Sequence, residues 1–431
     1  VFLRPLGLRL RVAAAAAAVF MAVSMVGCSS KTSGEQVQET KQETEQGEEQ
    51  EKELKVLTLK KENVDLFDDM LADYSKDHPG VTFKQTSGKQ ENLLTLISTN
   101  EVPDIMNVWP MNSLFREMMK EGVFMDLSGS EVLANVPENI LEACRYDGKD
   151  YSVPISVNSY SMFYNTELFE KEGLTYPKTE DEFWTLCDTL KSRGIPAVTI
   201  GDKDIGLLQG YFARMLTGTA SHDAKEITEA VASGEKSYSD YPEIVHFVES
   251  FLKLRDYTPT DSLGLAGADA REYFTNGEAA MYLGGTWNAT SIKATNPDLK
   301  YASALFPEMN GVEPWASGEV DTAWAVAANT AYPEDAKQTV EFLGTVEEAQ
   351  KYAEQDKAPC VITGVDSQVE ALATINDAVA SDQYIVSALT FWPAGMADEV
   401  AQALQQMFTS KDSAAFLDTF DQITRNYYSQ Q

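Results

Sequence analysis

The feature that most constrains the fold is an alternation of apolar patterns with the periods of a strand, a helix and a strand. Residues 55–59 (KVLTL) read as a strand, residues 64–74 repeat apolar side chains at helical spacing, and residues 81–83 (VTF) read as a second strand. A third strand is expected at residues 105–108. Because such units join parallel strands through right-handed crossovers, the pattern predicts an α/β fold.

The chain has 431 residues, more than one core of ordinary size holds, so two domains or two lobes are expected. The alternation returns in the second half, where residues 179–190 have one apolar helical face and residues 195–200 read as a strand. The last third of the chain is predicted to be mainly helical. Two α/β lobes, each a sheet flanked by helices, are the natural interpretation.

Composition excludes several classes of function. Asp and Glu total 67 against 34 Lys and Arg, a net charge of −33, and so acidic a surface repels the phosphates of nucleic acids. Three His and four Cys offer little material for a metal site, and no glycine-rich phosphate loop is present, so neither metal nor cofactor is expected. Apart from Cys28, at most one disulfide can form, and Cys187 on an apolar helical face favours a buried thiol.

The N-terminal segment has the pattern of an export signal. Three arginines within the first 11 residues precede an uncharged stretch, 12–27, and the sequence MVGCSS follows at 25–30. It resembles the lipobox of bacterial lipoproteins, which implies that residues 1–27 are removed and that Cys28 carries acyl chains such as palmitate. An ordinary secretory signal cleaved nearby is the alternative. Residues 28–53 are polar and acidic, which predicts a disordered tether to the membrane.

Six segments of the body carry a family resemblance. They are VPDI at 102–105 leading to Trp109, EGVFMDLS at 121–128, GKDYSVPISVNSYSMFYNTELF at 148–169, PKTEDEFWTLCDTL at 177–190, FTNGEAAMYLGGTW at 274–287, and the strand and Ala-rich helix of 324–343. In this order they resemble the extracellular carbohydrate-binding proteins of bacterial ABC importers, the maltodextrin-binding type. The resemblance implies a periplasmic-binding-protein-like fold with a ligand cleft between two lobes, residues 54–157 with about 320–362 and residues 158–319 with about 363–431.

The same resemblance implies the ligand-binding residues. A sugar has apolar C–H faces and a rim of hydroxyls, so its receptor needs aromatic plates and planar polar groups. The implied aromatic positions are Trp109, Tyr211, Trp287 and Trp392. The implied polar positions are Asn112, Asn158 and Gln209, with Asp321 and Asn63 as weaker additions.

Packing is the alternative for each aromatic residue. Binding is favoured for Trp287, because two preceding glycines let the backbone approach a ligand, and for Trp392, because Pro393 interrupts regular structure. Tyr211, expected on a loop before a helix, fits a core position equally well. Asn158 could instead satisfy backbone groups where the chain crosses between lobes.

These observations predict a non-enzymatic, monomeric receptor outside the cytoplasm, lipid-anchored to the cell membrane. It would capture a carbohydrate, in particular an oligosaccharide, and deliver it to the permease of an ABC importer. Crossings near 157–159 and 318–321 would act as the hinge on which the cleft closes. The alternatives are a secreted glycoside hydrolase, since carboxylates also suit glycan cleavage, and a receptor for a non-sugar solute such as a peptide or iron.

Overall fold

The computed structural model describes residues 51–99, 101–220, 223–259, 262–309, 314–366, 369–381 and 383–430. These residues belong to one compact unit. The expected signal segment, Cys28 and nearly all of the expected tether lie outside the described residues. Within them, no helix combines the length and the apolar character needed to cross a membrane.

The first sheet has the strand order β2-β1-β3-β10-β4. Its middle strands are lined by fully buried apolar side chains such as Val56 and Ile105, which explains the apolar runs in the sequence. β1 runs parallel to β2 and β3, as the strand–helix–strand pattern predicted, whereas β10 is antiparallel to β3 and β4. The strands are β1 (Lys52–Thr58), β2 (Val81–Ser87), β3 (Ile105–Val108), β4 (Val153–Val157) and β10 (Val320–Val326).

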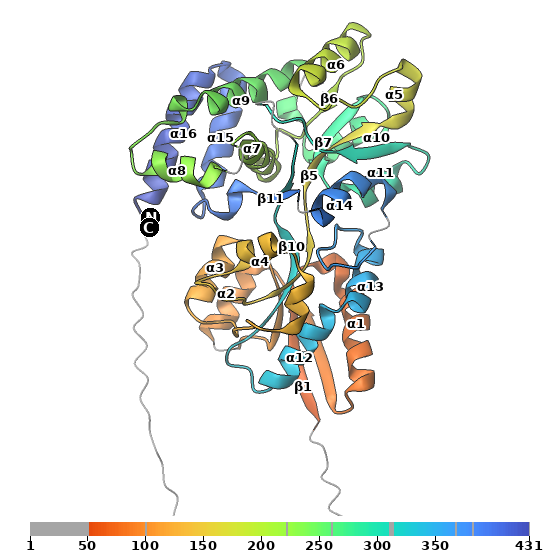
Figure 1. Cartoon of the computed structure of the whole chain (residues 1–431), viewed down its shortest axis with the longest axis vertical. Helices are drawn as coiled ribbons and strands as arrows, with labels where there is room; N and C mark the ends of the chain where they lie inside the picture. The colour runs from red at the N-terminus through yellow and green to blue at the C-terminus, as the bar shows by residue number, and fades with distance from the viewer. Residues whose placement is uncertain are drawn as a thin grey trace, which may run out of the picture. The chain divides into compact units, whose positions relative to one another are not determined.

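Helices flank this sheet, and we call sheet and helices together the first lobe. Figure 1 shows α2, α3 and α4 on one side of the strands and α1 and α13 on the other. The helices are α1 (Val64–Asp77), α2 (Gln90–Ser98), α3 (Ser113–Lys120), α4 (Glu138–Cys144), α12 (Pro333–Leu343) and α13 (Val346–Asp356).

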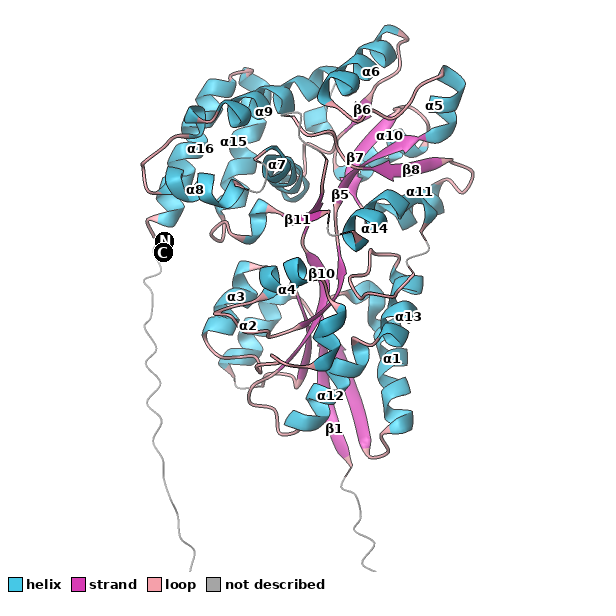
Figure 2. Ribbon diagram, viewed as in Figure 1, coloured by secondary structure: helices cyan, strands magenta, loops and turns pink. Residues whose placement is uncertain are grey.

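The second sheet has the order β11-β9-β5-β7-β6, and β8 pairs with β5. Together with its helices it forms the second lobe, in which α7 packs against α9 and α15, and α16 packs against α8, α9 and α15 (Figure 2). The strands are β5 (Tyr160–Asn165), β6 (Val198–Thr199), β7 (Met281–Gly285), β8 (Tyr301–Ala304), β9 (Ala316–Gly318) and β11 (Tyr384–Val386). The helices are α5 (Thr166–Glu172), α6 (Glu180–Ser192), α7 (Ile205–Thr219), α8 (Ala224–Ala232), α9 (Pro242–Lys253), α10 (Gly267–Thr275), α11 (Asn288–Thr295), α14 (Ala373–Ala380), α15 (Met396–Ser410) and α16 (Ser413–Tyr428).

Strand β6 is shorter than the strand expected at 195–200. Pro196 has no N–H to donate to a neighbouring strand, and the N–H of Ala197 donates to Tyr257 O at 3.1 Å rather than to a strand. Only Val198 and Thr199 therefore pair with β7. The strand predicted at 195–200 is therefore present only in part, and the residues before Val198 form a connection.

Two connections between the sheets lie side by side. The chain leaves the first sheet at Val157 and enters the second at Tyr160, and it returns from Gly318 to Val320. Asn158 N donates to Glu319 O at 2.9 Å, and Glu319 N donates to Asn158 Oδ1 at 3.1 Å. A Cβ atom on Gly318 would lie 2.1 Å from Asn158 O, so only glycine allows this close approach. The exact lobe boundaries expected from the sequence stay a prediction.

Candidate functional site

Two pockets lie next to these crossing segments. Pocket A, of about 380 Å³, and pocket B, of about 490 Å³, share Asn158 and Asp321 in their walls. Pocket A is also lined by four further predicted residues, Trp109, Asn112, Gln209 and Trp392. Pocket B is also lined by two more, Asn63 and Trp287. The fold thus brings together predicted residues that lie hundreds of positions apart in the chain.

Trp287 forms an exposed aromatic wall of pocket B. It follows β7 directly before α11, and 46% of its surface is exposed. Its ring meets the ring of Tyr160 edge to face, with centroids 5.2 Å apart. A Cβ atom on Gly285 would lie 2.1 Å from the indole ring of Trp287. The sequence suggested that this glycine lets the backbone approach a ligand, but its role in the structure is to make room for the tryptophan.

A largely buried charge cluster also lines pocket B. Lys60 Nζ lies 2.5 Å from Asp321 Oδ2, 3.0 Å from Asp356 Oδ2 and 2.8 Å from Tyr352 Oη. Asn63, the last residue of a 3₁₀ turn, donates from Nδ2 to Asp356 Oδ1 at 2.6 Å. Burial opposes the charge of Lys60, but Tyr352 and the two carboxylates outweigh it and raise the pKa of Lys60. The cluster therefore holds a fixed cation between two carboxylates.

The first-lobe wall of pocket A is held by hydrogen bonds. Trp109 Nε1 donates to Asp321 O at 2.8 Å, and its ring packs edge to face on Phe115 with centroids 6.2 Å apart. Asn112 is the N-cap of α3, where its Oδ1 accepts from Leu114 N at 2.9 Å. Both side chains are consequently positioned before any ligand arrives.

Three polar atoms in the walls of pocket A lack a hydrogen-bond partner among the described residues. They are Gln209 Oε1, Glu319 Oε1 and Trp392 Nε1, and all three are covered from water. Leaving such an atom unpaired costs roughly 1 to 3 kcal/mol, and in native proteins it usually points to a missing water or ligand. Two acceptors and one donor are therefore left without partners in residues that border the pocket.

The expectation that Tyr211 faces the cleft is wrong. Tyr211 lies within α7 rather than on a loop before it, is 0% exposed, and does not line the described pockets. Its ring meets Tyr160 edge to face with centroids 5.5 Å apart, and Tyr160 in turn contacts Trp287. Burial on the apolar face of a long helix decided between the two interpretations that the sequence left open. Tyr211 therefore packs in the core and supports Trp287 of pocket B through Tyr160.

Two other residues have mixed roles. Trp392 is only 3% exposed and packs edge to face on Phe420 at 5.7 Å, so most of its ring belongs to the second-lobe core although it borders pocket A. Asn158 uses its Oδ1 to bind the backbone of Glu319. One of the two polar side-chain atoms of Asn158 thus has the backbone-binding role that the sequence offered as the alternative to ligand binding.

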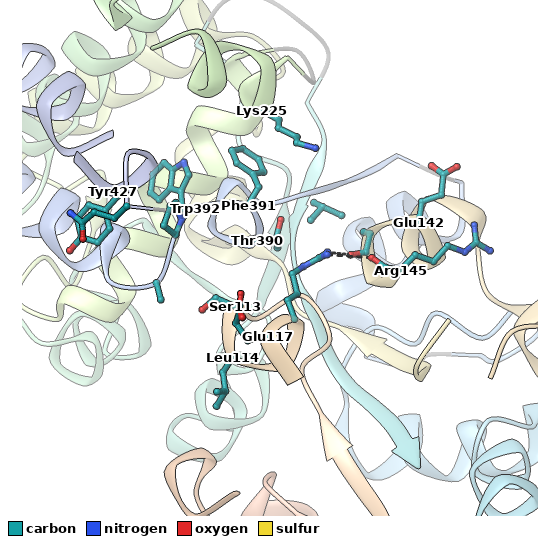
Figure 3. Close-up of a pocket in the computed structure, with 16 residues that line it drawn as sticks. Ser113, Leu114, Glu117, Glu142, Arg145, Lys225, Thr390, Phe391, Trp392 and Tyr427 are labelled. Carbon is teal, nitrogen blue, oxygen red and sulfur yellow. Dashed lines mark hydrogen bonds between the residues drawn. The ribbon is translucent and has the colours of Figure 1, made fainter. Parts of the chain in front are cut away.

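A third pocket, pocket C, of about 890 Å³, continues from pocket A past Trp392 and Pro393. Figure 3 shows Phe391, Trp392 and Tyr427 of the second lobe on one side and Glu142 and Arg145 of the first lobe on the other. Two of its cations have partners: Arg145 Nε lies 2.9 Å from Asp150 Oδ1, and Arg116 donates to the carbonyl oxygen of Ala143 at 2.6 Å. Pocket C therefore extends the space next to pocket A, and its Arg145 is ion-paired within the first lobe.

Sequence reasoning missed Lys60 and Glu319. Lys60 is followed by a second lysine and has no local pattern that marks it as buried. Glu319 lies in the connection between β9 and β10, where burial raises the pKa of its carboxyl to about 7. The approach of residues distant in the chain creates both environments, so neither could be read from a short segment.

The chemistry that these pockets can support is binding through stacking and hydrogen bonds. No His or Cys is among the described residues that line pockets A and B. The described residues contain no group of three or more His, Cys, Asp or Glu side chains that could hold a metal ion. The available groups are aromatic rings, amides, and carboxyls, the set expected for a ligand rich in hydroxyls.

Comparisons with known proteins agree with this geometry. The sequence profile of bacterial extracellular solute-binding proteins matches residues 69–379. The multiple sugar-binding protein of Streptococcus mutans is 27% identical over 312 residues, which cover 71% of this chain and 74% of that protein. The maltodextrin-binding protein MdxE of Bacillus subtilis is 27% identical over 250 residues, 54% of each chain.

Solved structures have the same architecture. The apo form of RafE from Streptococcus pneumoniae superposes with a TM-score of 0.80 at 25% identity, covering 87% of this chain and 98% of that one. RafE in complex with raffinose superposes with a TM-score of 0.74 over 87% and 99% of the two chains. The predicted two-lobed α/β fold and the predicted family are both confirmed, and the chain belongs to the family of bacterial extracellular solute-binding proteins.

Proposed function

We propose that this protein is the carbohydrate-binding component of an ABC importer and captures an oligosaccharide outside the cytoplasm. The observation that carries the proposal is the exposed ring of Trp287, which lines pocket B together with the polar residues Lys60, Asn63 and Asp321. An aromatic plate and hydrogen-bonding groups in one pocket suit a sugar ring, whose apolar faces stack while its hydroxyls bond. Relatives named for sugar binding and the raffinose complex of RafE support this choice of ligand.

Nine positions were predicted to bind the ligand, and we retain those that line the pockets. They are Asn63, Trp109, Asn112, Asn158, Gln209, Trp287, Asp321 and Trp392. Trp109 and Asn63 come from the first lobe, and Trp287 and Gln209 from the second. A ligand that touches both sets gains its full binding energy only when the lobes approach each other, which biases a hinge toward the closed form. The closed form is what the permease would recognise.

We further propose the cellular arrangement predicted from the sequence. Residues 1–27 would direct export, Cys28 would carry the lipid, and residues 28–53 would tether a monomeric receptor to the membrane without cofactors. The polar composition of the tether and the small residues around Cys28 support this arrangement. Replacing Cys28 by serine should release the protein into the soluble fraction. Unchanged sedimentation of Cys28→Ser with membranes would overturn lipidation as the anchor.

A glycan panel tests the proposed function. The protein should show a rise in melting temperature, Tm, with at least one of raffinose, stachyose, maltodextrin and diacetylchitobiose. Ligand that binds only the folded state adds about 2.7 kcal/mol at a free concentration of 100 times Kd, so the shift should grow with concentration. Galacturonic acid and a short peptide serve as non-matching solutes. A shift with the peptide and none with the glycans would favour the alternative of a non-sugar receptor.

One observation keeps a glycoside hydrolase as the second candidate. Pocket A is lined by two carboxyl groups in different environments. Asp321 is ion-paired with Lys60, whereas burial raises the pKa of Glu319 to about 7. A carboxylate beside a carboxyl of raised pKa is the pattern of a glycosidase acid–base pair. We expect no new reducing ends after prolonged incubation with raffinose or maltodextrin. Their steady appearance, lost in Glu319→Gln, would favour the hydrolase.

A further inference from the structure

Glu319 occupies an unusual place in the fold. It is the single residue between β9 of the second sheet and β10 of the first. Its backbone N–H and C=O both bond to Asn158 in the neighbouring crossing segment, at 3.1 and 2.9 Å. Glu319 lines pocket A together with Trp109 and Gln209. A carboxyl group is therefore fixed at the junction of the two lobes, in the wall of the proposed ligand pocket.

The described lining of the pocket beside this carboxyl offers it no cation. Among the described residues that line pocket A there is no Lys, Arg or His. The titratable groups that act on Glu319 are Asp321 on β10, Tyr160 on β5 and Tyr384 on β11. Lys60 binds Asp321 and Asp356 instead.

Hydrogen bonding only partly offsets this lack of a cation. The side chains of Ser387 and Asn158 favour the ionised form of Glu319, but Oε1 is covered and has no partner among the described residues. Burial is the largest influence, and together with the charge of Asp321 it raises the pKa of Glu319 to about 7. Near neutral pH the empty pocket is consequently balanced between the neutral and the ionised carboxyl.

We propose that the Glu319 carboxylate accepts a hydrogen bond from a hydroxyl of the bound carbohydrate, so that binding selects its ionised form and releases a proton. The inference rests on the proposed function. A hydroxyl that donates to the carboxylate stabilises the charged form, just as Ser387 and Asn158 do. Since ligand and proton compete, affinity increases with pH.

The same arrangement specifies the kind of ligand. Two carboxyl groups, Glu319 and Asp321, border pocket A, and no cation lines it to receive a negative charge. A uronic acid or a phosphorylated sugar would place its charge beside them, which costs electrostatic and desolvation energy. A neutral glycan supplies hydroxyl donors without that cost. Pocket A therefore selects neutral carbohydrates.

The size of the pH effect follows from the fraction of ionised carboxyl. With a pKa of about 7, roughly one-tenth of Glu319 is ionised at pH 6 and roughly nine-tenths at pH 8. If only the ionised form binds, the apparent Kd scales inversely with that fraction. Affinity for a neutral glycan should be about tenfold higher at pH 8 than at pH 6. Between the two limits, binding at pH 7 should release about half a proton per ligand.

Calorimetric titration with raffinose tests the proposal, with stachyose and maltodextrin as replacements if the glycan panel selects one of them. Titrations at pH 6, 7 and 8 give the pH dependence of Kd. Titrations at pH 7 in phosphate and in Tris, which differ in ionisation enthalpy, give the number of protons released. Glu319→Gln keeps the shape of the side chain but cannot ionise, so its Kd should no longer change with pH. Glu170→Gln, on the exposed side of α5, removes one carboxylate away from the pockets and should behave as the parent protein.

The outcomes separate this inference from the proposed function. A Kd that is equal at pH 6 and pH 8, or a pH dependence that persists in Glu319→Gln, overturns the role of Glu319 and leaves carbohydrate capture intact. Failure of every glycan to bind at any pH overturns both. If Glu319→Gln does not fold, as judged by its Tm, the proton count of the parent protein decides. Absence of proton release at pH 7 then refutes the proposal.

Discussion

Replacing Trp287 by alanine should weaken carbohydrate binding while leaving the fold intact. The ring is 46% exposed in pocket B, and a tryptophan offers about 250 Å² of surface, so roughly 115 Å² is free to contact a ligand. If a sugar ring covers half to all of this area, the alanine variant loses about 1.5 to 3 kcal/mol of binding free energy at 25 cal/mol per Å². Since 1.4 kcal/mol is a factor of ten, Kd should rise about 10- to 150-fold.

The cost to folding should be small because the exposed half of the ring contributes little. The edge-to-face contact with Tyr160 is worth about 0.5 to 1.5 kcal/mol, so Tm should fall by only a few degrees. Trp184→Ala is the matched control. Trp184 lies in α6, where its Nε1 donates to Glu180 at 2.9 Å and its ring packs on Phe183. This control should lower Tm and leave Kd unchanged.

Calorimetric titration with the glycan selected by the panel provides the measurement, and circular dichroism during heating provides Tm for each variant. If Trp287→Ala bound that glycan within a factor of two of the parent protein, the stacking role of Trp287 would be refuted. A large fall in Tm together with unchanged affinity would place the residue in the core instead.

Three further outcomes are expected. Gly285→Ala should displace the Trp287 ring, because the added Cβ would lie 2.1 Å from it, and should reduce affinity to the level of Trp287→Ala with no additional loss in the double variant. Lys60→Met should destabilise the fold by about 3 kcal/mol in urea unfolding, because two carboxylates lose their buried cation, whereas Lys61→Met at an exposed position should change stability little. Small-angle scattering should show a smaller radius of gyration at saturating glycan, and an unchanged radius would contradict hinge closure.

The sequence by itself determined the class of fold and most of the pocket walls. Strand and helix periods are local, so the order around residues 55–108 was predictable, and the structure has the predicted parallel pairing of β1 with β2 and β3. The family segments located Trp109, Asn158 and Trp287, because they lie at the ends of strands or in the connections between them. Residues at the ends of strands of one sheet meet at one edge, which made it predictable that Trp109 and Asn158 line the same pocket. Trp287 comes from the second sheet and lines pocket B, whose wall also contains Asn158.

Only the tertiary structure decided the environment of individual groups. Tyr211 looked equally suited to a cleft or a core, and packing of α7 against α9 and α15 buried it. Lys60 acquires its carboxylate partners from positions 261 and 296 residues further along the chain. Glu319 owes its raised pKa to burial where two distant connections meet. Desolvation and ion pairing depend on which residues come together in space, and that information is absent from any local pattern in the chain.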